Sequence, residues 1–320
     1  MKINAPVISV IIPCYNYGRF LPDACDSLLS QSMTNWECIL VNNGRFEETR
    51  DAANLYVNRD SRFKYLESDS MGPSLARNEG LAIAQGEFVQ FLDADDKLSP
   101  QRFSILLDLF ARDLGLDLVY SGVKYFATTE NNTYVDSLND LSSQGKGGHE
   151  GSGEDLYNLL IRRNIFVINS PLIRREILTL IGGFTSAFTH LEDWDLWLRS
   201  SALVRKFQFA NDERALAFVR SHQTSLSQNT TSMRSHYLPV LLSNTFYSRL
   251  KFKNFVFVYV IASEFIIDSF FNSNFNQVRK LLISTAFTFE NYLKLFIHFI
   301  LLPLYLPIYI VLKLYRKLVK

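Results

Sequence analysis

Short runs of apolar and β-branched residues alternate with segments of helical periodicity along the first 120 residues of the chain. In the first helical segment, Leu21, Ala24 and Leu28 fall on one face. Strands that alternate with helices at this spacing need crossover connections, so the pattern predicts an α/β fold whose mainly parallel central sheet is flanked by helices. The predicted strands are residues 7–12, 36–41, 63–67, 87–92 and 116–120.

Three acidic residues, Asp93, Asp95 and Asp96, directly follow the fourth of these predicted strands. In parallel sheets, ligands bind at the carboxyl ends of the strands, which is where these acids lie. Neighbouring carboxylates repel each other by about 1 kcal/mol per pair even in water, so a positive partner is expected. Carboxylate oxygens suit Mg²⁺ or Mn²⁺, which bridges them to phosphate oxygens. The stretch predicts a divalent-cation site for a phosphorylated ligand, with a solvated acidic turn as the alternative.

The composition excludes several classes of protein. The formal net charge of the 320 residues is +1, so no overall field attracts nucleic acid, and none is expected as a partner. Cys14, Cys25 and Cys38 are odd in number and form no CxxC pair, which argues against a disulfide framework or a zinc cluster. No GxGxxG dinucleotide motif follows the first strand. The N-terminus lacks a signal-peptide pattern, so this part of the chain is expected in the cytoplasm.

The C-terminal part differs from the rest in its apolar content. Residues 295–312 form an uncharged run of 18 that is followed by a basic tail. This run is just long enough to span a bilayer, and basic residues favour the cytoplasmic interface. We expect one domain over residues 1–235 and a helical region over 236–320, whose segment at about 293–316 associates with the cytoplasmic face of a membrane. The segment could span the membrane or lie in its interface, and a helix packed on the globular domain or on a partner subunit is the alternative.

Five ordered segments between residues 7 and 228 read VISVIIPCYN, WECILVNNG, GPSLARNEGLAIAQGEFVQFLDADD, HLEDWDLWLRS and FVRSHQTSLS. Together they resemble the inverting glycosyltransferases of family 2. The third ends in an Asp-x-Asp motif, the fourth contains a Glu-Asp pair, and the fifth contains Arg-x-His. The resemblance implies a GT-A fold, with a Rossmann-like nucleotide-binding half and a hydrophobic helical extension at the C-terminus.

The resemblance also implies which residues bind the donor. Asp93 and Asp95 match the Asp-x-Asp motif and would bind Mn²⁺ or Mg²⁺, with Asp96 as a weaker candidate. His222 matches a position that reaches the metal or the pyrophosphate in some relatives. The implied contacts with the nucleotide sugar come from Pro13, Tyr15, Asn16, Asn42, Asn43, Arg77, Asn78 and Asp93.

The Glu-Asp pair carries the catalytic prediction. The resemblance implies that Asp193 is the general base and that Glu192 is its neighbour, facing the acceptor or the donor sugar. An attacking sugar hydroxyl needs a carboxylate within hydrogen-bond reach on the face opposite the leaving group, and direct displacement inverts the anomeric carbon. The alternative for Asp193 is a helix N-terminal acid that the helix dipole favours, and Asp195 could share either role.

One position departs from the family pattern. Where relatives usually carry two acids after the second strand, this chain has Asn42 and Asn43. An amide offers a donor and an acceptor but no charge, so it can still bind the edge of uracil or guanine.

The function expected from these features is metal-assisted transfer of a sugar from a nucleotide-diphosphate donor to a hydroxyl of a saccharide or lipid-linked saccharide. The alternative, motivated by Asn42 and Asn43, is a catalytically weak or inactive relative that binds nucleotide sugars as a scaffold in glycan assembly. An enzyme that modifies sugar nucleotides would need a redox or nucleophilic site, and the sequence shows none. The donor sugar, the base, the acceptor, the linkage and the oligomeric state are not specified by these motifs.

Overall fold

The computed structural model describes residues 5–128, 134–136, 148–221, 237, 239–241 and 243–244. Its contacts divide the chain into two units, residues 1–160 with 164–228 and residues 161–163 with 229–320. Most of residues 236–320 lie outside the described ranges, so the predicted domain division at residue 235 stays a prediction. No helix within the described ranges combines the length and the apolar content needed to cross a membrane, and the predicted membrane segment lies outside them.

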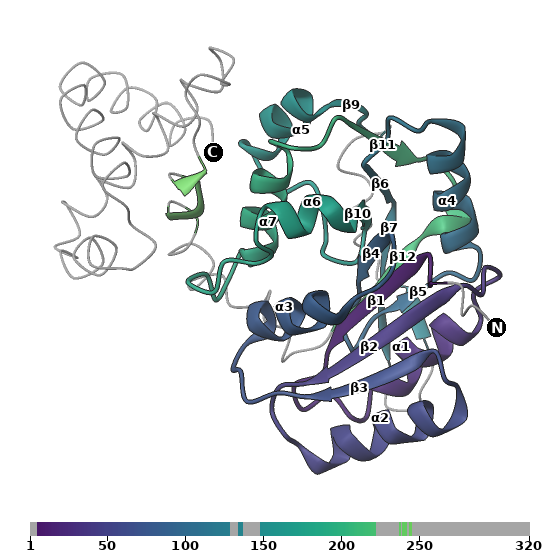
Figure 1. The fold of residues 1–320 in the computed structure, drawn as a ribbon. Coiled ribbons are helices and arrows are strands. Elements are labelled where there is room, and N and C mark those ends of the chain that lie inside the picture. The colour runs from purple at the N-terminus through teal and green to yellow at the C-terminus, as the bar shows by residue number, and fades with distance from the viewer. Residues whose placement is uncertain are drawn as a thin grey trace, which may run out of the picture. The chain divides into compact units, whose positions relative to one another are not determined.

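The first unit is built around a sheet of eight described strands in the order β3-β2-β1-β4-β10-β6-β11-β9 (Figure 1). Strands β1 to β4 are mutually parallel, whereas β10 runs antiparallel between β4 and β6. A mainly parallel sheet was predicted, and the structure confirms it. The bounds are β1 Ile8–Pro13, β2 Trp36–Asn42, β3 Phe63–Glu67, β4 Phe88–Phe91, β6 Leu118–Ser121, β9 Gly151–Ser152, β10 Pro171–Arg174 and β11 Lys206–Ala210.

A second, smaller sheet follows the acidic stretch. Its four described strands lie in the order β5-β12-β7-β8, with β12 antiparallel to β5 and parallel to β7. The register places Phe218 opposite Lys97, so the end of β12 runs towards the acidic residues that precede β5. The bounds are β5 Lys97–Leu98, β7 Val123–Thr128, β8 Tyr134–Asp136 and β12 Ala217–Arg220.

Helices cover both faces of the large sheet. Successive side chains of a strand point to opposite faces, so Ile8, Val10 and Ile12 of β1 join one core cluster, whereas Ile11 faces α3. At Gly80 of α3, an added Cβ would lie 2.5 Å from Ile11, so only glycine allows this close approach of the helix to the sheet. The described helices are α1 Leu21–Leu29, α2 Glu47–Arg59, α3 Pro73–Ile83, α4 Arg102–Arg112, α5 Gly153–Leu160, α6 Arg175–Leu180, α7 Glu192–Ser200 and the 3₁₀ helix η2 Glu213–Ala215.

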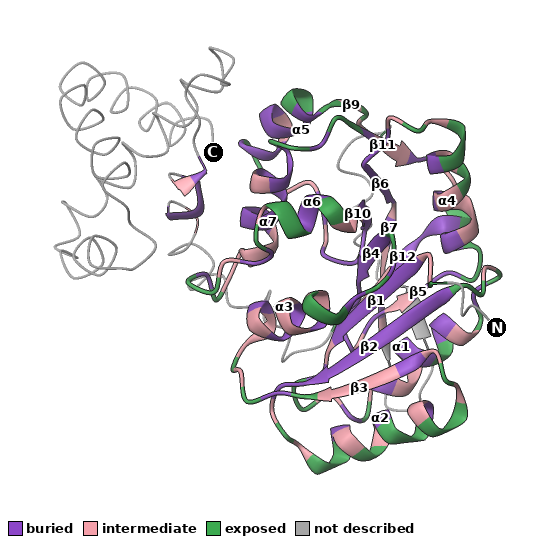
Figure 2. Cartoon of the chain, viewed as in Figure 1, coloured by how far each residue is buried: buried purple, intermediate pink, exposed green. Residues whose placement is uncertain are grey.

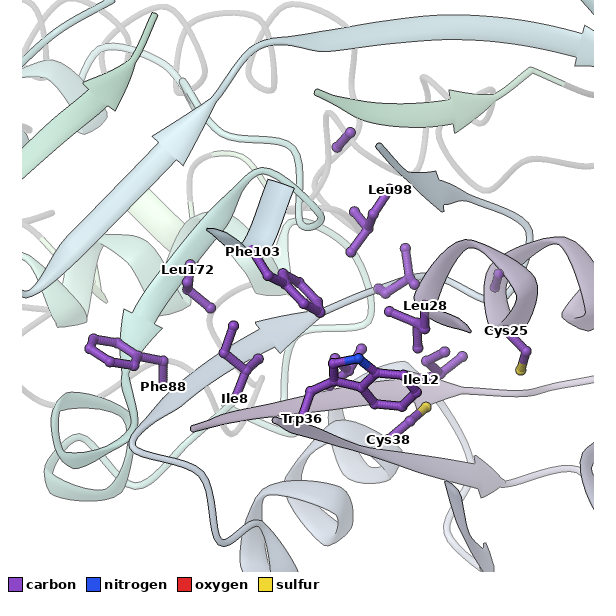
Figure 3. Close-up of a cluster of buried hydrophobic side chains, with 14 of the residues drawn as sticks. Ile8, Ile12, Cys25, Leu28, Trp36, Cys38, Phe88, Leu98, Phe103 and Leu172 are labelled. Atoms are coloured by element: carbon purple, nitrogen blue, oxygen red, sulfur yellow. The ribbon is translucent and has the colours of Figure 1, made fainter. Parts of the chain in front are cut away.

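The core cluster joins α1 and α4 to the sheet (Figure 3). Trp36 of β2 is 2% exposed and makes an edge-to-face contact with Phe63, at 5.4 Å between ring centroids. Figure 2 shows β1, β2 and β4 as buried strands, with the exposed residues of α2 on its outer side. Truncating a fully buried aromatic side chain of this kind costs about 3–5 kcal/mol, so this cluster contributes strongly to the stability of the sheet.

The register brings the ends of three strands to one edge of the sheet. Pro13 of β1 is paired with Val41 of β2, and Ile11 is paired with Phe91 of β4. Because these strands are parallel, the residues that follow them emerge on the same side. Antiparallel β10 begins where β4 ends, so Asn169, which lies two positions before β10, reaches the same edge.

Candidate functional site

The acidic stretch after β4 forms a tight turn in which the Asp96 N–H donates to the Asp93 carbonyl at 3.1 Å. Asp93 and Asp95 are half-buried, whereas Asp96 is 3% exposed. Asp96 Oδ1 accepts the Arg220 N–H at 2.7 Å, and Oδ2 accepts the Asn169 amide. Burial raises the pKa of Asp96 well above its usual range, and the charges of Asp95 and Asp93 raise it further. Asp96 therefore anchors the turn, and Asp93 and Asp95 are the two of its acids that reach the surface.

Two residues that the sequence analysis did not identify hold this turn. Asn169 Oδ1 accepts the Asp93 N–H at 2.9 Å, and its amide nitrogen donates to Asp96. One side chain is therefore bonded to the first and the last residue of the turn. Arg220 donates from Nε to the Asp95 carbonyl at 2.8 Å and pairs with Asp23 of α1. The Arg-x-His motif pointed to the region of Arg220, but nothing in the sequence showed that the strand after Asn169 is antiparallel.

A buried arginine joins the acidic turn to the Glu-Asp segment. Arg77 of α3 donates from Nη2 to Asp93 Oδ1 at 2.8 Å and from Nη1 to Glu192 Oε1 at 2.9 Å. The exposed fractions of these side chains are 5% for Arg77, 34% for Asp93 and 15% for Glu192. Burial raises the pKa of Asp93, Arg77 lowers it, and the charges of Asp95 and Glu192 raise it, with a net upward shift. The structure thus brings together three of the predicted site residues.

Asp193, the predicted base, lies at the first turn of α7 with both carboxylate oxygens hydrogen-bonded. Oδ1 accepts the Trp194 N–H at 2.7 Å, and Oδ2 accepts the Asn164 amide at 2.9 Å. Burial raises the pKa of Asp193 to about 7; the charge of Glu192 adds to the rise, and Arg77 opposes it. A carboxylate with a pKa near neutrality is suited to accept a proton.

Asp195 has a different role from its neighbour. It is 1% exposed, and its Oδ2 accepts from Arg199 Nε at 2.9 Å and from the Thr185 hydroxyl at 2.8 Å. The buried ion pair ties α7 to the segment before it. Asp195 is thus held in an ion pair with Arg199, which leaves Asp193 as the candidate for proton transfer.

The amide nitrogens of Asn42, the last residue of β2, and of Asn43, which follows it, both donate to the protein. Asn42 Nδ2 donates to the Phe46 carbonyl at 3.2 Å and to Tyr65 Oη at 3.0 Å, and Asn43 Nδ2 donates to the Gly72 carbonyl at 3.3 Å. Both Oδ1 atoms are buried and have no hydrogen-bond partner in the described part of the chain. A buried acceptor without a donor costs about 1–3 kcal/mol, so each oxygen is suited to an N–H group of a ligand.

The residues at the end of β1 and after it lie near Asn42 and Asn43. Tyr15 is 42% exposed and makes an edge-to-face contact with Phe46, at 5.1 Å between ring centroids. Asn16 has a left-handed backbone with φ 48°, which asparagine tolerates better than most residues, and Pro13 ends β1 beside Val41.

Tyr17 was not identified from the sequence, although it lies close to the acidic turn. Burial raises its pKa to about 12, and the charges of Asp95, Asp93 and Asp96 contribute. The negative charges of the acidic turn therefore act on the residues that follow β1. Its position two residues after Tyr15 gave no signal that distinguishes it from a core aromatic.

Asn78, a predicted nucleotide contact, is paired with the protein backbone. Its Nδ2 donates to the Phe184 carbonyl at 2.9 Å, and its Oδ1 accepts the Phe184 N–H at 2.7 Å. Both polar ends of the amide are thus occupied. Contact between Asn78 and a nucleotide stays a prediction.

The acidic turn fits a divalent cation that takes most of its ligands from a substrate. Within the described residues no group of three or more His, Cys, Asp or Glu side chains could hold a metal. Asp93 and Asp95 supply two half-buried carboxylates whose like charges repel, and Mg²⁺ sites of this kind use one or two carboxylates with phosphate oxygens and water. His222, the third predicted ligand, lies outside the described residues.

Comparison with known proteins shows which family this chain is similar to. Residues 9–170 match the model described as Glycosyl transferase family 2. The chain is 27% identical over 235 residues to chondroitin synthase of Pasteurella multocida, which covers 73% of this chain and 23% of that protein. It is 36% identical over 130 residues to an uncharacterized glycosyltransferase of Bacillus subtilis, EpsJ, which covers 41% of this chain and 37% of that protein. The chain thus spans 23% to 37% of the length of these relatives.

Comparison with solved structures identifies the fold. The S. aureus protein TarS, residues 1–349, has a TM-score of 0.59 at 18% identity, covering 92% of this chain and 80% of that one. The mannosyltransferase PcManGT from Pyrobaculum calidifontis, in complex with GDP-Man and Mn²⁺, has a TM-score of 0.55 at 17% identity, covering 80% and 70%. The predicted GT-A fold is confirmed.

Proposed function

This chain belongs to glycosyl transferase family 2, and we propose that it moves a sugar from a nucleotide-diphosphate donor to a hydroxyl of a saccharide or lipid-linked saccharide, with inversion at the anomeric carbon. One observation carries the proposal: Arg77 links Asp93 of the acidic turn to Glu192, the neighbour of Asp193. A group that holds a diphosphate and a group that accepts a proton are what such a transfer requires.

The donor diphosphate binds at the acidic turn in this proposal. Asp93 and Asp95 are its two half-buried carboxylates, and they would hold Mn²⁺ or Mg²⁺. When bound there, the cation would act as a Lewis acid that offsets the negative charge developing on the departing diphosphate. The solved structure of PcManGT with GDP-Man and Mn²⁺ supports this choice of ligand class.

The base of the nucleotide lies over the residues that follow β1 and β2. Tyr15 offers a half-exposed aromatic ring, with Pro13 and Asn16 beside it, and the unpaired oxygens of Asn42 and Asn43 accept N–H groups. Both uracil and guanine carry an N–H on the edge that would face them. The complexes of TarS with UDP-GlcNAc and of PcManGT with GDP-Man support either base.

The acceptor hydroxyl gives its proton to Asp193. With a pKa of about 7, Asp193 is partly ionised at neutral pH, and it holds a proton more readily than an exposed aspartate does. The Asn164 amide and the Trp194 N–H fix the orientation of the carboxylate. The carboxylate thus remains aligned while the hydroxyl attacks the anomeric carbon on the side opposite the diphosphate.

The membrane part of the proposal rests on the sequence of the C-terminus. The uncharged run at residues 295–312 and its basic tail would hold the enzyme at the cytoplasmic face of a membrane, close to a lipid-linked acceptor. Deleting residues 290–320 tests this. Loss of sedimentation with membranes is expected, and unchanged sedimentation would exclude this anchor.

Nucleotide-sugar turnover tests the catalytic proposal. The full chain is incubated with a panel of UDP- and GDP-sugars with Mn²⁺, Mg²⁺ or EDTA, and release of nucleoside diphosphate is measured with and without saccharide acceptors. Metal-dependent release from one donor is expected, with Asp193→Asn inactive but still able to bind nucleotide. Release that is unaffected by EDTA, or by Asp193→Asn, would contradict the proposal.

A second candidate function is nucleotide-sugar binding without transfer, as a scaffold for glycan assembly. The observation in its favour is the presence of Asn42 and Asn43 at the end of β2, where the resemblance leads us to expect two acids. Calorimetric titration with UDP and with GDP separates the two. Metal-dependent binding without turnover on any donor would favour the scaffold.

A further inference from the structure

The position of Arg77 carries an inference that rests on the proposed function and deepens it. Arg77 lies on α3 with 5% of its side chain exposed. Both terminal nitrogens are used, one by Asp93 and the other by Glu192. Its Nε is buried and has no hydrogen-bond partner among the described residues. Because the guanidinium is buried and already donates to two carboxylates, little of it is accessible to a diphosphate.

The surroundings of Arg77 keep it in this place. The guanidinium carbon lies 5.3 Å from the centroid of the Phe184 ring, and Phe184 makes an edge-to-face contact with Phe91 at the end of β4. Asn78, the next residue of α3, holds the Phe184 backbone at both its N–H and its carbonyl. The same helix therefore sets the position of the arginine and of the ring beside it.

The negative charges around Arg77 outnumber its single positive charge. Asp93 experiences the negative charges of Asp95 and Glu192 and the positive charge of Arg77. A single guanidinium thus serves carboxylates from two segments that lie far apart in sequence. Without it, these acids would repel one another across a half-buried space, because the like-charge interaction grows as water is excluded.

We propose that Arg77 is a positioning residue and an internal counter-ion: it aligns Asp93 of the acidic turn with the Glu192–Asp193 segment and does not bind the diphosphate of the donor. The planar guanidinium holds its two terminal nitrogens in a fixed geometry, and each of them donates to a different carboxylate. The Arg77 guanidinium therefore sets the spacing between Asp93, which would hold the donor, and the Glu192–Asp193 segment, which would accept the proton. Its positive charge also limits how strongly the free protein attracts a cation.

The test uses the full chain and calorimetric titration with Mn²⁺ alone. Arg77→Met removes the positive charge, so Mn²⁺ is expected to bind about tenfold more tightly. Arg77→Lys keeps the charge and should bind Mn²⁺ within about threefold of the wild type. The matched control is Arg174→Met, which breaks a bridge between Glu87 and Asp117 away from the site and should leave Mn²⁺ binding unchanged. Unchanged or weaker Mn²⁺ binding by Arg77→Met would overturn the counter-ion role.

Nucleotide binding distinguishes positioning from direct contact. With saturating Mn²⁺, UDP and GDP should bind Arg77→Lys within about threefold of the wild type, while kcat on the active donor falls about 100-fold with little change in KM, because alignment is lost. A tenfold loss of UDP or GDP affinity with kcat unchanged would make Arg77 a diphosphate ligand and would overturn the proposal.

A thermal unfolding cycle tests the bridge even if the proposed transferase function fails. Arg77→Met, Glu192→Gln and the double variant are compared without metal. Because the two side chains are in contact, their effects on the melting temperature should not be additive. The sum of the losses in the two single variants should exceed the loss in the double variant by about 3 °C or more. Additive losses would overturn the bridge. If Arg77→Met does not fold, Arg77→Gln is used in both tests with the same expectations.

Discussion

The side-chain oxygen of Asn169 accepts the backbone N–H of Asp93 at 2.9 Å, although the two residues are 76 positions apart. The same side chain donates to the buried carboxylate of Asp96. The shape of the acidic turn is thus set by a residue from another strand. The two acids that the turn presents to a ligand, Asp93 and Asp95, depend on this contact for their position.

Replacing Asn169 with alanine should destabilise the fold and weaken metal binding. The change removes two hydrogen bonds and leaves a buried carboxylate without its side-chain donor, which predicts a loss of about 3 kcal/mol in the free energy of unfolding. Urea unfolding and titration with Mn²⁺ measure the two effects.

Gln31→Ala is the matched control for Asn169→Ala. Gln31 is a buried amide that bonds to Ser27, Ser99 and Phe103. The Gln31→Ala variant should be less stable than the wild type but should bind Mn²⁺ with the same affinity. Equal Mn²⁺ affinity in the Asn169 and Gln31 variants would show that Asn169 does not position the turn.

Asp193→Asn is expected to remove sugar transfer while sparing the binding of nucleotide. The amide has nearly the same shape but cannot accept the proton of the acceptor hydroxyl, and loss of a general base typically lowers kcat by about 10²–10⁴-fold. Turnover and Mn²⁺-dependent UDP or GDP binding are measured on the same preparation. Asp113→Asn, which alters an ion pair with Lys206 away from the site, should keep full turnover. A drop of less than threefold in kcat for Asp193→Asn would assign the base to another residue.

The raised pKa of Asp193 predicts opposite trends of activity and stability with pH. Transfer needs the ionised carboxylate, so kcat/KM, which reports the free enzyme, should rise as pH increases through about 7. The folded-state pKa lies above the unfolded value, so the folded protein holds this proton more tightly. The resulting contribution to stability is complete below about pH 3.8 and is lost as pH rises through about 7.

Urea unfolding of the wild type and Asp193→Asn between pH 5 and pH 8 checks the stability trend. Neighbouring groups also contribute, since Glu192 raises the pKa of Asp193 and Arg77 lowers it. The difference between the two proteins should change across this range. Parallel pH profiles would show that Asp193 titrates at its ordinary value.

Asn43→Leu should leave the free protein about as stable as the wild type while weakening nucleotide binding. The substitution removes a buried oxygen that has no donor, but it also removes the hydrogen bond to the Gly72 carbonyl. Losing one hydrogen bond to the base predicts a decrease in affinity of about tenfold.

Thermal unfolding with and without GDP or UDP in Mn²⁺ checks this expectation. The ligand-induced rise in melting temperature should shrink in Asn43→Leu and be retained in Asn35→Leu, where the amide is exposed. A wild-type response of Asn43→Leu to both nucleotides would place the base elsewhere.

The alternation of apolar strands with amphipathic helices was enough to predict the parallel half of the fold. The predicted strand at 63–67 is β3 as observed, and those at 7–12 and 36–41 differ from β1 and β2 by one residue at the ends. β1 and β2 are predictable because nearly every residue in each is buried, which leaves a largely apolar run in the sequence. The acidic residues could be assigned to the sheet edge for the same reason, since they follow such a run directly.

The sequence by itself determined which residues carry charge and, to within a residue, where strands β1 to β4 end, and from these the acidic turn and the Glu-Asp segment could be identified. Only the tertiary structure decided that β10 runs antiparallel, that Asn169 therefore meets Asp93, and that Arg77 lies between Asp93 and Glu192. Strand direction and burial depend on contacts between distant segments, so they cannot be predicted from local periodicity. The pKa of Asp193 is decided in the same way, because burial and the charge of Glu192 act through space.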